Sequence, residues 1–262
     1  MTDHDPAPQN APAAAPAAAK PGGLGARAGY LALGLSVIAL GLAAAPYFTG
    51  DGDVRGYLLK HPEVLQEASA ALQQKEAQAR VDEINQAAAA NAGLLAPDSR
   101  DPSFGPADAK VTVIEFFDFR CPGCKAVAHD YRALMAAHPE VRFVFKDWPI
   151  LDRGEDVTSQ YAARAALAAH QQGKYLEVYD ALMNARALSI ASIDQILAQH
   201  GVDMTRAKAA IAAPDTTRHI ADIHTTAAAL RLQGTPSFFV NGKASAGIDP
   251  AEIGRMIEAA KR

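Results

Sequence analysis

The chain of 262 residues contains only two cysteines, and two residues separate them in the motif Cys121-Pro122-Gly123-Cys124. The run 111–117 before them is rich in β-branched and aromatic residues, which predicts a buried strand. Pro122 and the apolar residues that follow at helical spacing predict a helix beginning at the first cysteine. Unpaired N–H groups and the helix dipole favour a thiolate there. We therefore predict that Cys121 is the attacking sulfur and that Cys124 closes a disulfide with it.

Two cysteines this close together have other interpretations. An inert structural disulfide is disfavoured, because so small a loop removes little entropy from the unfolded chain. The interpretation that the two cysteines supply half of the ligands of a zinc site is disfavoured, because there is no other cysteine and a tetrahedral site needs two further ligands. The cysteine count thus favours reversible thiol–disulfide exchange, and we expect neither a resident metal nor a cofactor. A different class of function stays open, in which the two thiolates form a soft site for Cu(I).

The first fifty residues predict export. The net charge of −4 argues against nucleic-acid binding, which needs a basic surface. Residues 1–27 are mostly Ala, Pro and small polar residues and predict a disordered tail. The uncharged run 28–50 is just long enough to cross a bilayer as a helix. Lys20 and Arg27 before it, with acidic residues after it, predict an anchor with its N-terminus in the cytoplasm.

A cleaved signal peptide is the alternative for the same run, because Ala43-Ala44-Ala45 satisfies the small-residue cleavage rule. Cleavage near Ala45 would release a soluble periplasmic protein, whereas the long leader favours an uncleaved anchor. Either way we expect the cysteines on the periplasmic side of a bacterial inner membrane, where disulfides persist.

The rest of the chain divides into a helical stalk, a linker and one globular domain. Residues 53–95 are rich in helix formers, and Leu58, Leu65 and Leu72 recur every seven residues. This segment is either a solvated stalk or a site of homo-oligomerisation. Three prolines in 96–106 predict a linker. Residues 104–262 predict an α/β domain with strands at 110–117, 141–148, 237–241 and 243–247, helices at 121–137 and 250–261, and a helical block inserted at about 156–232.

Several of these segments resemble one family. Residues 115–124 closely resemble the DsbA-like branch of thioredoxin-fold thiol–disulfide oxidoreductases, in which an acid lies six residues before the first cysteine. Residues 234–242 are similar to its cis-proline loop and following hairpin, and 145–151 to its segment after the second strand. Residues 54–65 resemble the N-terminal helices of the ScsC-like (suppressor of copper sensitivity) subgroup. The resemblance covers residue 53 to the C-terminus and implies a thioredoxin-like fold with a helical insertion.

The resemblance also implies roles for individual residues. Glu115 would accept the proton of Cys124, unless the alternation of its strand turns it to solvent. Thr235-Pro236 would form a cis peptide opposite the cysteines and pair with an extended substrate, the alternative being a trans proline at a strand start. Family members often carry a bulky or imidazole side chain where Gly123 stands, so we predict a weaker oxidant than the strongest members.

We therefore expect an exported oxidase, isomerase or reductase of protein disulfides. Its partners would be cysteine-containing exported proteins and a membrane redox protein that resets the pair. The direction of electron flow stays open, because a threonine before the proline resembles reductases and isomerases as much as oxidases. The competing function is a copper(I)-binding module for metal stress, which would use the same two cysteines.

Overall fold

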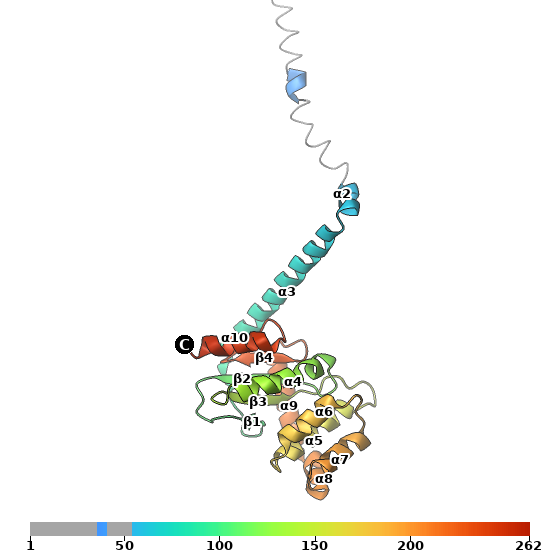
Figure 1. Cartoon of the computed structure of the whole chain (residues 1–262), viewed down its shortest axis with the longest axis vertical. Helices are drawn as coiled ribbons and strands as arrows, with labels where there is room; N and C mark the ends of the chain where they lie inside the picture. The colour runs from blue at the N-terminus through green and yellow to red at the C-terminus, as the bar shows by residue number, and fades with distance from the viewer. Residues whose placement is uncertain (1–35, 41–53) are drawn as a thin grey trace, which may run out of the picture. The chain divides into compact units, whose positions relative to one another are not determined.

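The computed structural model describes residues 36–40 and 54–262, which fall into two compact units divided after Ser69 (Figure 1). The tail expected at 1–27 and the anchor expected at 28–50 lie outside these residues, except for 36–40, which are helical. Within the described ranges no helix has the length and apolar character needed to span a membrane.

Helix α2 (Val54–Lys60) and the first turns of α3 (Glu63–Ala90) form the described part of the first unit apart from 36–40. Pro62 separates the two helices, because proline lacks the N–H that a continuous helix would need there. The side chains of Leu65 and Leu72 are 55% and 57% exposed, so the predicted heptad positions are uncovered in a single chain.

The second unit contains a sheet whose described strands follow the order β1-β3-β2-β4-β5. The strands are β1 (Ser103–Phe104), β2 (Thr112–Phe117), β3 (Arg142–Asp147), β4 (Ser237–Val240) and β5 (Lys243–Ala244). Strands β2 and β3 are parallel, with Phe117 opposite Asp147, and helix α4 (Pro122–Ala137) connects them. The remaining pairs are antiparallel, and α10 (Pro250–Ala260) follows the β4–β5 hairpin. The predicted strands and helices occur in the expected order, although β5 is shorter than expected. Strand β1 was not predicted: it lies in the segment 96–106 expected as a linker, where pairing with β3 makes two residues extended.

A helical block separates β3 from β4, as the sequence predicts. It consists of α5 (Thr158–His170), α6 (Tyr175–Asn184), α7 (Ile190–Gln199), α8 (Met204–Ala212) and α9 (Pro214–Ala229) (Figure 1). Alanines line most of the buried face of α5, and their small side chains let the neighbouring helices approach closely.

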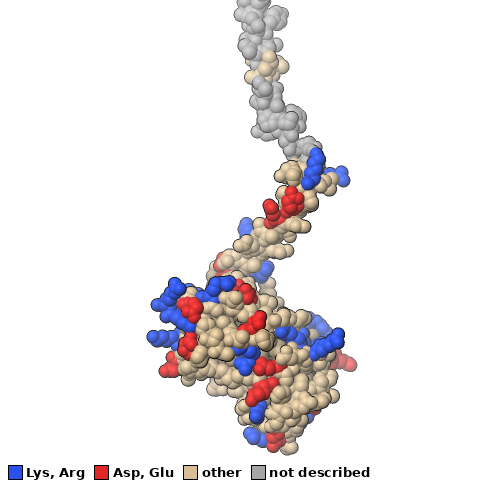
Figure 2. All heavy atoms as spheres, in the orientation of Figure 1, with Lys and Arg blue, Asp and Glu red and all other residues tan. Residues whose placement is uncertain are grey.

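Helices cover both faces of the sheet. One face carries Val113, Glu115 and Phe117 of β2 and packs against α4, α6 and α10. The other face carries Ile114 and Phe116 and packs against α9 and the end of α3. Ala88 of α3 is buried in this second layer, so the last turns of the expected stalk helix belong to the compact unit. Figure 2 shows acidic and basic side chains interspersed over the visible face of this unit.

Candidate functional site

The two cysteines lie where β2 gives way to α4. Cys121 is the N-cap of the helix, with Pro122 at its first position, where a missing N–H costs no helical hydrogen bond. Both cysteines are free thiols, and their exposed fractions are 7% for Cys121 and 0% for Cys124. The first sulfur is therefore the accessible one, and the second lies inside the core.

The surroundings of Cys121 favour its thiolate. A hydrogen bond from the Cys124 thiol contributes most to lowering the pKa of Cys121, which falls to about 5 although burial opposes the shift. The side chain of Thr235 and the backbone N–H groups of Cys124 and Gly123 lower this pKa further. Cys121 is thus mostly ionised at neutral pH, and the thiolate is the form that attacks a disulfide.

Cys124 has the opposite character. Burial raises the pKa of its thiol far above that of a free cysteine, and the hydrogen bond to Cys121 and the nearby Glu115 add to the shift. This sulfur therefore keeps its proton until a base removes it.

Glu115, whose charge contributes to the raised pKa of Cys124, is fully buried on the face of β2 that packs against α4 and α6. The hydroxyl of Tyr179 donates to its Oε2 at 3.4 Å, while its Oε1 has no partner in the described part of the chain. Burial raises the pKa of Glu115 well above its usual value. The alternative in which strand alternation turns Glu115 to solvent is wrong, because residues 113, 115 and 117 all face the core.

The peptide bond between Thr235 and Pro236 is cis, as predicted. Sγ of Cys121 lies 3.2 Å from the carbonyl oxygen of Thr235, to which it donates when it is protonated, so the fold joins two motifs that are far apart in the sequence. A Cβ added to Gly123 would lie 3.3 Å from Cδ of Pro236 and 3.7 Å from the Cys121 sulfur. Glycine at this position therefore leaves the space between the thiol and the proline open.

A second buried acid, Asp147, was not predicted as part of the site. It lies on the same face of the sheet as Glu115, at the end of the adjacent strand, and is 1% exposed. The hydroxyl of Tyr175 donates to its Oδ2 at 2.9 Å. Burial raises the pKa of Asp147, and its charge in turn raises the pKa of Glu115. The signal in the sequence that could have identified Asp147 is a carboxyl at an inward-facing position of a buried strand.

Two further polar residues hold the elements around the cysteines. Asp118 is buried after β2 and accepts hydrogen bonds from the N–H groups of Ile150 and Leu151 and from the hydroxyl of Ser159. The Lys125 ammonium donates to three carbonyl oxygens at the end of α6, those of Leu182, Met183 and Ala185. These hydrogen bonds connect α6 of the helical block to α4, the helix that begins after Cys121.

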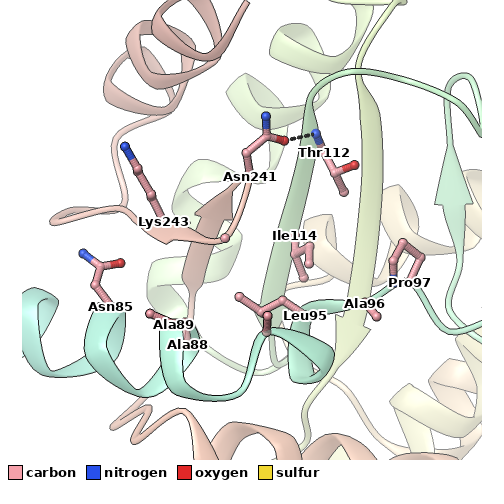
Figure 3. A pocket seen from close by; sticks show the side chains of 12 residues that line it. Asn85, Ala88, Ala89, Leu95, Ala96, Pro97, Thr112, Ile114, Asn241 and Lys243 are labelled. Atoms are coloured by element: carbon pink, nitrogen blue, oxygen red, sulfur yellow. Dashed lines mark hydrogen bonds between the residues drawn. The ribbon is translucent and has the colours of Figure 1, made fainter.

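The larger cleft of the second unit does not contain the cysteines. It has a volume of about 700 Å³ and lies between the end of α3 and the sheet, with Ala88, Ala89 and Leu95 opposite Ile114 (Figure 3). A smaller hollow of about 170 Å³ is lined by Pro236, although neither cysteine lines it. No group of three or more His, Cys, Asp or Glu side chains suited to a metal ion occurs among the described residues.

The chain is similar to several known proteins. Residues 98–259 match the family described as Thioredoxin, and residues 54–79 match the Copper resistance protein ScsC N-terminal domain. A thioredoxin-like oxidoreductase from Silicibacter pomeroyi DSS-3 is 37% identical, with a TM-score of 0.58 over 63% of this chain and 94% of that one. Proteus mirabilis ScsC in a transitional conformation is 25% identical, with a TM-score of 0.59 over 83% of this chain and 97% of that one.

The Na(+)/H(+) antiporter NhaA 3 of Salinispora tropica is 34% identical over 145 residues, which are 55% of this chain and 22% of the antiporter. The chain therefore spans about a fifth of the length of this curated relative. The matched families and the similar structures together show that the chain belongs to the thioredoxin superfamily, as a DsbA-like protein of the ScsC type.

Proposed function

We propose that the chain is an exported protein thiol–disulfide oxidoreductase that uses Cys121 and Cys124. The observation that carries the proposal is the contrast between the two thiols, because the pKa of Cys121 is lowered to about 5 and that of Cys124 is raised. An attacking sulfur must be ionised, whereas a resolving sulfur must stay silent until a mixed disulfide has formed.

The reaction proceeds in two exchange steps. The Cys121 thiolate attacks one sulfur of a substrate disulfide, whose S–S bond breaks, and the departing thiolate takes a proton from solvent. Cys124 then gives its proton to Glu115, which accepts it in its ionised form and is a stronger base because its pKa is raised. The Cys124 thiolate attacks the Cys121 sulfur, the mixed disulfide breaks, and the second substrate sulfur leaves as a thiolate that takes a proton from solvent. The substrate gains two electrons and the protein forms its own disulfide, and the reverse sequence oxidises a substrate dithiol.

Thr235 and Pro236 would bind the substrate beside the attacking sulfur. The carbonyl of Thr235 already contacts the Cys121 thiol, so a substrate chain paired with this loop presents its sulfur to Cys121. Extended peptides commonly bind by such main-chain pairing.

Export and membrane attachment form part of the same proposal. The apolar run 28–50 with Lys20 and Arg27 before it supports an anchor whose N-terminus is cytoplasmic, and cleavage near Ala45 is the alternative. The partners would be exported proteins with cysteines and a membrane protein that resets the pair. The exposed Leu65 and Leu72 on α3 support self-association through residues 53–95.

Insulin reduction with glutathione as electron donor tests the redox function. Cys121→Ser should abolish activity, because no other sulfur of the pair is ionised and accessible. Cys124→Ser should instead accumulate mixed disulfides that are visible on a non-reducing gel. Full activity in the Cys121 variant would overturn the mechanism.

A second candidate is Cu(I) binding by the two thiols. The match of residues 54–79 to the Copper resistance protein ScsC N-terminal domain favours it, as does the proximity of two soft ligands. Anaerobic titration of the reduced protein with Cu(I) separates the candidates. Tight binding of one ion per chain together with negligible insulin reduction would favour copper binding over exchange.

A further inference from the structure

The groove beside Pro236 has one wall that does not come from the strands and loops around the cysteines. This wall is the part of α3 that carries Ala77, Arg80, Val81 and Ile84. The opposite wall consists of the cis-proline loop and residues 244–248. A chain segment bound at the cis-proline would thus contact α3 as well.

The α3 wall is fixed to the sheet. Ala77, Val81 and Ile84 recur at helical spacing on the covered side of the helix, ahead of the buried Ala88. Oδ1 of Asn85 accepts the N–H of Ala244 at 2.8 Å. These contacts keep the wall in place without a substrate.

The groove continues from the redox site. Thr235 and Pro236 separate the Cys121 thiol from the groove, since the Thr235 carbonyl accepts from that thiol and Pro236 lines the hollow. Ile248, which is 40% exposed, also lines it, and its Cδ1 lies 3.7 Å from where a Gly123 Cβ would be. A segment whose cysteine meets Cys121 therefore enters this groove with the neighbouring residues.

Arg80 is the free charge of the groove. Its side chain is exposed and forms no ion pair or hydrogen bond with any other described residue. Glu83, three residues after Arg80 on α3, is instead paired with Arg231 at 2.5 Å. The nearby acid, Glu252, accepts the N–H of Ala246 at 3.2 Å. An unpaired guanidinium beside an apolar surface suits a ligand with a carboxylate next to an apolar side chain.

We propose that this groove binds the residues flanking the cysteine of a substrate protein, and that Arg80 selects segments with an acidic residue there. The inference rests on the proposed exchange function and specifies its substrate class. The apolar contacts would come from Val81, Ile84, Pro236 and Ile248.

Two synthetic peptides test the proposal, each a mixed disulfide with glutathione. They differ only in carrying Asp or Lys on both sides of the cysteine. The full chain should reduce the Asp peptide about two- to fivefold faster in kcat/KM, which is the size expected of one exposed ion pair. Arg80→Glu should reverse the preference, and added salt should weaken it in the native protein. Lys75→Glu makes an equal charge change at an exposed position of α3 outside the groove and should leave the preference for the Asp peptide unchanged.

The possible results separate the two levels of the proposal. Equal preferences in the native protein and in Arg80→Glu, with both peptides reduced, would overturn the role of Arg80 and leave the exchange function standing. Failure of the native protein to reduce either peptide would overturn the exchange function and this inference with it. Circular dichroism of both variants controls for folding, and Arg80→Gln should give an intermediate preference.

Discussion

Replacing Cys124 should change the acidity of Cys121 in a way that depends on the new side chain. The hydrogen bond from Cys124 is the largest cause of the low pKa of Cys121. A hydrogen bond to a charged group contributes about 1.5–3 kcal/mol, and one pKa unit corresponds to about 1.36 kcal/mol. Cys124→Ala should therefore raise the pKa of Cys121 from about 5 by roughly 1–2 units. Cys124→Ser keeps a hydroxyl donor at the same place and should leave that pKa near about 5.

The assay is the rate of Cys121 alkylation by iodoacetamide as a function of pH, with the modified residue identified by mass spectrometry. The native protein should react with a midpoint near about 5, because Cys124 keeps its proton and stays unmodified. Identical midpoints for the alanine and serine variants would refute the assignment of the shift to this hydrogen bond. A native midpoint near that of a free cysteine would remove the basis for an ionised attacking sulfur.

Three further substitutions have expected outcomes. The raised pKa of Glu115 means that the folded protein holds this proton more tightly than the unfolded chain, so native stability falls as the pH rises above the ordinary value for glutamate. Glu115→Gln should reduce that loss in urea unfolding series at several pH values, with the remainder due to the raised pKa of Asp147, yet slow resolution of the mixed disulfide in stopped-flow experiments. Lys125→Met should lower the unfolding free energy by about 1.5–3 kcal/mol, because three carbonyls lose their charged donor, whereas the exposed Lys243→Met should not. Asp118→Asn should cost about 1–3 kcal/mol by the same measurement and increase hydrogen exchange at Ile150, because an amide has a single acceptor oxygen for four donors, which include the N–H of Arg120.

Local patterns in the sequence were enough to predict the centre of the site. The β-branched run before Cys121 and the proline after it determine a strand–helix junction within a dozen residues, and the structure has that junction. The pairing of Thr235-Pro236 with the cysteines came from family resemblance, since no local rule joins segments so distant.

Other parts of the site depend on tertiary packing and could not be predicted. The burial of Glu115 was left open, because a continuous apolar strand does not reveal which face a single carboxyl takes. The hydroxyls of Tyr175 and Tyr179 reach Asp147 and Glu115 only because α6 lies across that face of the sheet. Likewise, the hollow that α3 and Pro236 line together requires the docked position of a helix whose sequence predicts a stalk or a site of homo-oligomerisation.

The two outer strands of the sheet, β1 and β5, have two residues each, and the amide of Asn85 occupies the N–H of Ala244 at the β5 side. A sheet with such short margins offers little backbone onto which a foreign strand could stack. In the proposed exchange function, an extended substrate segment bound near the thiol therefore finds little free edge along which cross-β stacking could start.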